Sequence, residues 1–168
     1  EIILVHGNEN RLLIRIVDIS VSFLGLLVSL PVSIPAAILI KLESKGPIFF
    51  KQKRISRHGE LFDVFKFRTM EKNAEKNTGP VLSDQNDSRV TKVGKILRKT
   101  RVDEIPQLYN VLKGDMSLIG PRPERPHFVE KFEKEISDYK YRHRIKSGVT
   151  GLAQVYGFYD TDAEDKLR

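Results

Sequence analysis

The longest apolar stretch lies near the start of the chain, where residues 19–40 (ISVSFLGLLVSLPVSIPAAILI) contain no charged side chain. A straight helix of this length rises roughly 33 Å, which is enough to cross the hydrocarbon core of a bilayer. Pro31 and Pro35 fall in its second half, and a proline inside a helix removes a hydrogen bond and bends the helix. We therefore predict a membrane helix that is broken near Ser29 to Pro31.

Cations flank this stretch on both sides. Arg11 and Arg15 precede it, and only Glu43 offsets the cations that follow it: Lys41, Lys45, Lys51, Lys53, Arg54 and Arg57. Positive residues beside membrane segments favour the cytoplasmic side, so both helix ends are expected on one side. A helix that enters the bilayer, breaks and returns satisfies both the prolines and the charges. Two alternatives stay open: a transmembrane helix with a proline kink, and a buried core helix of a soluble protein.

Short alternating runs follow residue 46. IFFKQKR (48–54) and LFDVFKFRTM (61–70) are separated by the polar stretch SRHGE, which predicts a β-hairpin. Phe65 and Phe67 share one face of the second run and are expected in the core, while Lys66 and Arg68 share the other face. That second face is either an ordinary solvated surface or part of an anion-binding site.

Helical patterns dominate the rest of the chain. Thr91 is placed to cap a short helix, TKVGKILRKT, and apolar residues at spacings of three and four predict an amphipathic helix that ends at Gly114. Pro106 must lie in the first turn, so this second helix starts at about residues 102–104. Residues 128–145 carry a charged amphipathic pattern that is typical of a surface helix.

Two loops complete the predicted organisation. The polar residues 71–90 predict a long loop, and the glycines of GVTGLAQVYG (148–157) predict a loop with a short strand. The 168 residues suffice for one core, and the formal charge of +7 favours an acidic partner: nucleic acid, a phosphorylated small molecule or an anionic membrane surface. Without cysteine the chain has neither disulfides nor thiolate metal sites, and its four histidines show no metal-ligand spacing.

The candidate chemistry lies in KILRKTRVDEIPQLYNVLKGDMSLIGPRPERP, residues 95–126. Asp103 and Glu104 fall at the predicted helix N-terminus, where unpaired N–H groups keep a carboxylate ionised and attract phosphate. The simplest interpretation is two capping acids, each worth about 1 kcal/mol or less. The cations that precede the pair favour a phosphate site instead: Arg98, Lys99 and Arg101. Arg122, held between two prolines, is suited to clamping two phosphate oxygens.

The order of the proline-broken helix, GPIFFKQKR, FKFRTM, LRKTRVDEIPQLYNVLKGDMSLIGPRP and GVTGLAQV resembles the bacterial monotopic phosphoglycosyl transferases. The resemblance covers about residues 11–157. It implies an α/β fold: a small membrane-associated domain with an N-terminal proline-broken re-entrant helix, a β-hairpin and several amphipathic helices. We expect a flank of a longer chain at 1–10, the re-entrant helix at 11–42, and at 43–168 a cytoplasmic catalytic domain truncated at its C-terminus.

The resemblance also implies an activity. Members transfer a sugar 1-phosphate from a UDP-sugar to a polyprenyl phosphate such as undecaprenyl phosphate and release UMP, with Mg²⁺ and a covalent intermediate. This is the first membrane step of exopolysaccharide, O-antigen, capsule or glycoprotein glycan assembly, on the cytoplasmic face of the bacterial inner membrane. The implied partners are the UDP-sugar, the polyprenyl phosphate and membrane lipids, with no nucleic acid. A homodimer is compatible with such a domain, although no stretch predicts one.

Roles follow from the matching motif positions. Asp103 is the implied nucleophile, which attacks the phosphate that bears the sugar, and Glu104 its partner in proton handling or metal placement, so both are implied Mg²⁺ ligands. The implied phosphate ligands are Arg98, Arg122, Lys66 and Arg68. Ser29 and Pro31 form the implied break of the membrane helix.

The sequence departs from the family pattern at its C-terminal end. Leu152 stands where many members have Trp, and Tyr156 and Phe158 stand where many have Asn and Arg, which affects the expected sugar recognition.

Two other classes of function stay open. A basic membrane-surface binding module explains the charge but not Asp103 and Glu104. A Mg²⁺-dependent phosphatase or pyrophosphatase would use the same carboxylates and would release phosphate without a lipid acceptor.

Overall fold

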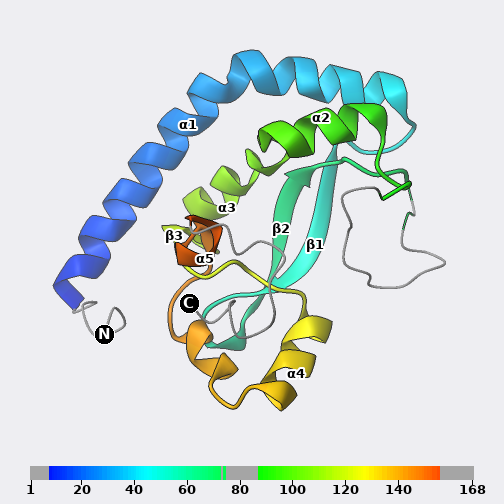
Figure 1. The fold of residues 1–168 in the computed structure, drawn as a ribbon. Helices are drawn as coiled ribbons and strands as arrows, with labels where there is room; N and C mark the ends of the chain where they lie inside the picture. Colours follow the sequence, from blue (N-terminus) through cyan, green and yellow to red (C-terminus); the bar gives the residue numbers. More distant parts are fainter. Residues whose placement is uncertain (1–7, 73, 75–86, 156–168) are drawn as a thin grey trace.

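The structure is a computed structural model that describes residues 8–72, 74 and 87–155. The helices are α1 (Asn8–Glu43), α2 (Lys92–Thr100), α3 (Gln107–Lys113), α4 (Pro126–Glu135) and α5 (Leu152–Val155). The strands are β1 (Phe49–Ile55), β2 (Leu61–Phe67), β3 (Ser117–Ile119) and β4 (Gly148–Thr150). The short 3-10 helices are η2 (Arg57–Gly59), η3 (Val102–Glu104) and η4 (Tyr139–Arg144). In Figure 1, α1 arches over α3 and α2, and the β1–β2 hairpin stands below them.

The apolar segment forms one helix that bends in its middle. Helical backbone continues through Pro31 and Pro35, so the predicted break is instead a change of direction, which Figure 1 shows clearly. The Ser29 hydroxyl donates to the Leu26 carbonyl at 2.9 Å, and the Ser33 hydroxyl donates to that of Ser29 at 3.4 Å. These hydroxyls therefore find their partners inside the helix, as a polar group in apolar surroundings must.

The first half of α1 is held by polar contacts. Arg15 donates to two carbonyls in the last turn of α3, each at an N–O distance of 2.6 Å. Asp18 is buried, and its carboxylate accepts from the Ser117 hydroxyl at 3.1 Å and from the Leu118 N–H at 2.9 Å. Two charges in a largely apolar helix thus fasten it to α3 and β3.

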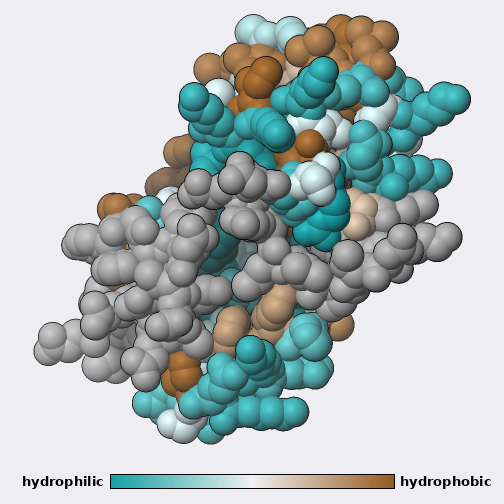
Figure 2. All heavy atoms as spheres, turned by 45° about the vertical axis from the view of Figure 1, so that its right-hand side comes forward, coloured by the Kyte–Doolittle hydropathy of each residue, from teal (hydrophilic) through white to brown (hydrophobic). Residues whose placement is uncertain are grey.

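The residues of α1 that face the rest of the domain recur every three or four positions, which is the period of a helix. These buried and half-buried residues include Arg15, Asp18, Ser22, Gly25, Ser29, Ser33, Ala36 and Ile40. They are mostly small or polar, whereas the exposed residues of the helix are large and apolar. Figure 2 shows such apolar residues gathered along the top of the molecule, over α1.

This distribution argues against one alternative for α1. The helix is long and apolar enough to cross a membrane, and only 11% of its most apolar window is buried inside the structure. A core helix of a soluble protein would be buried on its apolar side, so that alternative is wrong for the described chain. An apolar face of this extent is typical of a lipid or protein contact.

The predicted hairpin is confirmed, but its core face differs from strict alternation. β1 and β2 pair antiparallel over all their residues. Phe67 packs in one core with α2 and the second half of α1, whereas Phe62 and Val64 pack in another with α3. Phe65, which we expected in the core, is half-buried and meets Tyr109 edge-on, with ring centroids 5.5 Å apart. The inward face of β2 changes between residues 64 and 67, which alternation does not reveal.

The helix expected from about residue 102 to Gly114 is divided. Residues 102–104 form the separate turn η3, and α3 begins only at Gln107, after Pro106. Gly114 ends it with a positive φ of 96°, as predicted. Asp103 and Glu104 therefore lie in a tight turn between α2 and α3 and not at the N-terminus of a long helix.

The start of α2 agrees with the sequence-based prediction, and the end of α4 does not. Thr91 caps α2 as expected, and its hydroxyl oxygen accepts from the Gly94 N–H at 2.9 Å. The single surface helix predicted for residues 128–145 is wrong: α4 ends at Glu135, and η4 begins at Tyr139, whose side chain turns inward and is fully buried.

Part of the predicted loops lies outside the described residues. Of the loop at 71–90, residues 73 and 75–86 lie outside the described residues, and an antiparallel bridge from Met70 to Val90 joins its ends. The departures at Tyr156 and Phe158 also lie outside them, while Leu152 starts α5.

Asn110 of α3 joins this helix to the hairpin. The side chain is completely buried; its oxygen accepts from the Phe65 N–H at 2.9 Å. Its amide nitrogen donates to the Asp63 carbonyl at 2.7 Å and to the Asp115 carboxylate at 3.2 Å.

We expect Asn110→Ala to lower the free energy of unfolding by about 2–4 kcal/mol, because buried partners would lose their hydrogen bonds. Chemical denaturation of the full-length protein in detergent measures the change. Lys131→Ala is the control, since it removes only an exposed ion pair with Glu135 and should change stability by less than about 0.5 kcal/mol. Equal effects of the two variants would contradict the expectation.

Candidate active site

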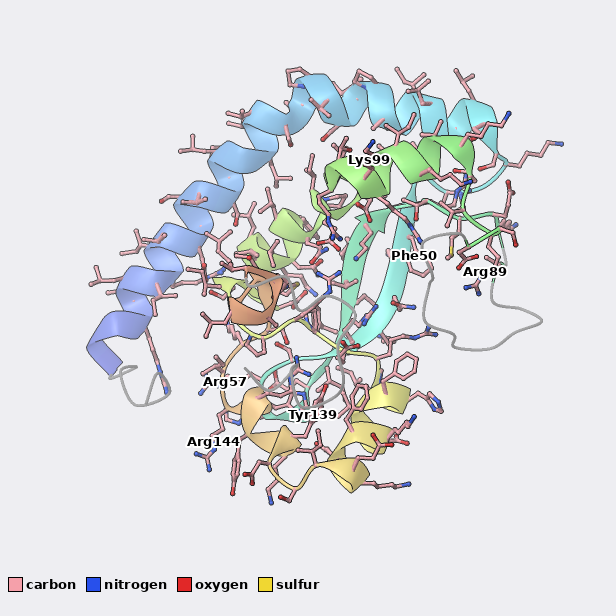
Figure 3. The ribbon with its side chains drawn as sticks, in the orientation of Figure 1. Phe50, Arg57, Arg89, Lys99, Tyr139 and Arg144 are labelled. Carbon is pink, nitrogen blue, oxygen red and sulfur yellow. The ribbon has the colours of Figure 1, made fainter. Side chains whose placement is uncertain are left out.

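The candidate site lies where η3, β2 and the loop between β3 and α4 meet. Glu104 of η3 binds two cations through one carboxylate oxygen, Lys66 at 2.6 Å and Arg122 at 2.7 Å. Its other oxygen accepts from Arg122 at 3.4 Å. Figure 3 shows nitrogen- and oxygen-bearing side chains crowded between the hairpin and α2, on which Lys99 is labelled. The structure thus brings three predicted site residues into direct contact.

These contacts determine the ionisation of Glu104. Burial by itself would raise the pKa of Glu104, but the charges and hydrogen bonds of Arg122 and Lys66 hold it well below the ordinary value. Burial and the neighbouring Arg122 lower the pKa of Lys66, and Glu104 opposes this shift. Glu104 is therefore ionised near neutral pH, and its negative charge neutralises two partly buried cations.

Asp103 has a different environment from its neighbour. Its side chain is buried, and its Oδ1 atom has no hydrogen-bond partner among the described residues. Burial raises the pKa of Asp103, Lys66 and Arg98 work against that shift, and Glu104 adds to it. A carboxylate with an unpartnered oxygen beside cations is suited to attack an electrophilic phosphorus atom. The surroundings thus shift the pKa values of these two adjacent carboxylates in opposite directions.

Arg98 approaches the site from α2. Its Nε donates to the Thr69 hydroxyl at 2.9 Å, just after β2. Burial lowers the pKa of Arg98, and the carboxylates of Asp103 and Asp87 oppose this shift. Arg98 consequently acts on the Asp103 carboxylate, as Lys66 does.

The loop that carries Arg122 is fixed along its backbone. The carbonyls of residues 121–124 accept, in order, from Gly148 N–H at 3.0 Å, the Arg142 guanidinium at 2.8 Å, the Arg54 guanidinium at 3.1 Å and Ile55 N–H at 3.0 Å. Arg142 also stacks on Tyr139 and donates to its hydroxyl group. The orientation of Arg122 therefore depends on anchors from β1, η4 and β4.

Sequence analysis missed Arg54 and Arg142 as parts of this site. Arg54 lies 69 residues before the residue whose carbonyl it binds, and Arg142 lies 20 residues after the residue whose carbonyl it binds. Local pattern carries no signal for such contacts. The sequence identifies Arg54 only as one of several cations that follow the apolar helix.

Arg68, expected in the same pocket, has a different position. Its guanidinium donates to three backbone carbonyls in and just after the last turn of α1, at 2.8–3.3 Å, and to the Ser44 hydroxyl at 2.8 Å. A cation there offsets the negative end of the helix dipole. β2 ends at Phe67, so alternation no longer places Arg68 beside Lys66. The geometry does not support a phosphate-binding role for Arg68.

Among the described residues, no group of three or more acidic, histidine or cysteine side chains is placed to hold a metal ion. Both oxygens of Glu104 already face cations, so Mg²⁺ would compete with Lys66 and Arg122 there. The unpartnered Oδ1 of Asp103 is a ligand of the kind Mg²⁺ prefers, and substrate oxygens and water would supply the others. The residues fit Mg²⁺ through Asp103 better than through both carboxylates.

Comparison with known proteins gives a consistent result. A family model described as bacterial sugar transferase matches residues 9–168. The UDP-N-acetylgalactosamine-undecaprenyl-phosphate N-acetylgalactosaminephosphotransferase of Aeromonas hydrophila is 47% identical over 151 residues, which are 90% of this chain and 36% of that protein. The UDP-glucose:undecaprenyl-phosphate glucose-1-phosphate transferase of Escherichia coli K12 is 44% identical over 159 residues, 94% of this chain and 34% of that protein. The chain thus spans about a third of the length of both relatives.

We expect Glu104→Gln to lower the free energy of unfolding by about 3 kcal/mol near neutral pH, because Lys66 and Arg122 would remain as uncompensated cations. The pKa of Glu104 is depressed on folding, so its contribution is present above the ordinary value of 4.5 and is lost as the pH falls toward the folded value. Urea denaturation at several pH values measures this. A deficit that does not shrink below about pH 4.5 would contradict it.

Asp103→Asn should act in the opposite direction and raise stability near neutral pH, because it removes a buried negative charge. The pKa of Asp103 is raised on folding, so its ionisation destabilises the folded state as the pH rises above the ordinary value of 3.8. The gain should therefore disappear in acid. Thermal unfolding of both variants beside wild type tests the contrast, and a destabilised Asp103→Asn protein would count against it.

Proposed function

Because the chain belongs to the bacterial sugar transferase family, we propose that it transfers a sugar 1-phosphate from a UDP-sugar to a polyprenyl phosphate. The products are a polyprenyl diphosphate sugar and UMP. The names of both relatives, which specify undecaprenyl phosphate as acceptor, support this reaction. The observation that carries the proposal is the unpartnered oxygen of the buried Asp103 beside the cations Lys66 of β2 and Arg98 of α2.

The reaction proceeds in two displacements. Asp103 Oδ1 attacks the phosphorus that bears the sugar, a new oxygen–phosphorus bond forms, and the bond to UMP breaks with its electron pair on UMP. An oxygen of the polyprenyl phosphate then attacks the same phosphorus, and the bond to Asp103 breaks to restore the carboxylate. Covalent catalysis of this kind divides one difficult transfer into two easier steps.

The cations would stabilise charge on the transferring group. A guanidinium has five N–H donors, so Arg122 can bind a phosphate oxygen while it contacts Glu104. Lys66 and Arg98 would neutralise the remaining oxygens, as preorganised charges do in phosphoryl transfer. Bound Mg²⁺ would add a further positive charge there. Glu104 would keep Lys66 and Arg122 in position, and burial of Asp103 would limit hydrolysis of the intermediate.

We further propose that α1 holds this site at the cytoplasmic face of the bacterial inner membrane, with its apolar face in the lipid. The first half of the helix docks through Arg15 and Asp18, and the second half packs through Ala36 and Ile40. Both halves contact the same domain, so the contacts favour a helix that stays on one side of the bilayer. The proline bend and the flanking cations support the same arrangement.

The first experiment measures the intact mass of the full-length protein in detergent after brief exposure to UDP-sugars with Mg²⁺. We expect wild type to gain the mass of one sugar phosphate and to lose it when polyprenyl phosphate is added. Asp103→Asn should gain nothing, because it lacks the nucleophile. Lys131→Gln, an exposed change on α4, is the control and should behave as wild type.

Other outcomes would contradict parts of the proposal. UMP release that needs lipid and leaves no adduct would mean direct transfer without an aspartyl intermediate. Phosphate release without lipid would identify a phosphatase. Neither product, with salt-sensitive binding to anionic membranes in both wild type and Asp103→Asn, would identify a binding module.

Arg142 offers a second test, since it acts through the Arg122 carbonyl. We expect Arg142→Gln to lower kcat/KM by about tenfold and Arg122→Gln by about a hundredfold. The double variant should be no slower than Arg122→Gln alone, because both changes disturb one interaction with the substrate. Steady-state kinetics with matched melting temperatures measure the coupling. Simple multiplication of the two losses would show that Arg142 acts independently of Arg122.

A further inference from the structure

A second cationic pocket lies at the turn of the hairpin. It has a volume of about 350 Å³ and is lined by η2 and its flanks, by the turn after α3 and by Lys146. Figure 3 shows Arg57, one of its lining residues, at the end of the hairpin remote from α2. Leu61 and Lys66 are five residues apart on β2, so at about 3.3 Å per residue the pocket lies roughly 17 Å from the cations around Glu104. The two sites share no lining residue.

Two cations in this pocket lack acceptors. The Nε atom of Arg57 is buried and has no hydrogen-bond partner among the described residues. In the same part of the chain, the amino group of Lys146 makes no hydrogen bond or ion pair. The guanidinium of Arg57 as a whole makes no hydrogen bond or ion pair among the described residues, so a ligand that supplies acceptors would be bound favourably.

A third cation raises the positive charge at the edge of the pocket. Arg15 and Lys146 both approach Gly114, where a side-chain carbon would lie 3.5 Å from the Arg15 guanidinium and 3.8 Å from the Lys146 amino group. Burial lowers the pKa of Lys146; Arg15 and Arg57 lower it further, while Asp18 and Asp115 oppose the shift. The cations thus outweigh the carboxylates at Lys146.

The carboxylates that line the pocket do not supply acceptors to Arg57 and Lys146. Asp115 already accepts from Lys113 at 3.1 Å and from Asn110 at 3.2 Å through the same oxygen. Glu60 is exposed and forms no ion pair with Arg57 or Lys146 in the part of the chain that the structure describes. The pocket therefore presents unpaired donors to an anion.

We propose that this pocket binds a phosphate group, with Arg57 and Lys146 as its ligands. A guanidinium and an ammonium are the side chains that bind phosphate oxygens most strongly. The volume is at the lower end of the range for small-ligand pockets, roughly 300–1,000 Å³, so an organic part of the ligand also fits. The phosphate belongs either to a soluble compound or to the headgroup of an anionic lipid. The inference is independent of the reaction at Asp103.

The test uses the full-length protein in detergent and a trace amount of an amine-reactive ester at mildly alkaline pH. Peptide mass spectrometry reports the modification rate of each lysine, and a pKa of Lys146 below its ordinary value favours its reaction. We expect millimolar inorganic phosphate, at constant ionic strength, to slow the modification of Lys146 several-fold. Lys131, an exposed lysine on α4, should react at an unchanged rate and serves as the internal control.

Variants of Arg57 test whether the protection of Lys146 depends on a ligand bound in this pocket. Arg57→Gln should abolish the protection of Lys146, and Arg57→Lys, which keeps a cation, should retain part of it. Equal melting temperatures of the variants would exclude misfolding as the cause. The protein reconstituted in vesicles of phosphatidylglycerol or of phosphatidylcholine distinguishes the sources of phosphate. Protection only in phosphatidylglycerol indicates a lipid headgroup, and protection only by inorganic phosphate indicates a soluble ligand.

Three results would overturn the proposal. The first is that neither inorganic phosphate nor phosphatidylglycerol protects Lys146. The second is equal protection of Lys146 in wild type and in a folded Arg57→Gln protein. The third is that Lys146 does not react with the ester at all.

Discussion

The pairing of Glu104 with Lys66 and Arg122 is the interaction on which the rest of the site depends. It joins the hairpin, η3 and the loop before α4, which are far apart in the chain. Half-buried cations need a compensating anion, and without it Lys66 and Arg122 would repel each other. The loop is in turn pinned through four successive carbonyls, so Arg122 reaches Glu104 from a fixed position.

The same arrangement explains how neighbouring carboxylates differ. Glu104 is occupied by its cations, and Asp103 retains a buried oxygen without a partner. Burial disfavours the charged form of Asp103, so the ionised carboxylate lowers the stability of the fold at this position. Perturbed carboxylates of this kind cluster at functional sites, which supports the proposed role of Asp103.

Helix α1 reverses the usual distribution of side chains in a surface helix. Its small and polar residues face the domain, and its large apolar residues face outward, as Figure 2 shows over the top of the molecule. Small side chains permit close approach to α3, while Arg15 and Asp18 specify the register of docking. Helix α1 is thus part of the folded domain, and its orientation relative to the site is determined by direct contacts.

The sequence by itself determined the features that depend on local pattern. The uncharged stretch predicted a long apolar helix, although the break expected near Pro31 is a bend in a continuous helix. Alternation around a polar turn predicted the hairpin, and Thr91 and Gly114 marked helix ends. Each depends on residues within a few positions of one another. The motif around Asp103 indicated phosphate chemistry for the same reason, since its residue types are contiguous.

Only the tertiary structure decided which of these residues meet. It separated Lys66 from Arg68, although they share a predicted face, and it moved Phe65 out of the core. It also placed Asp103 in the turn η3 and brought in Arg54 and Arg142. These outcomes follow from contacts between distant segments, whose energies depend on burial and on partners that no local pattern contains.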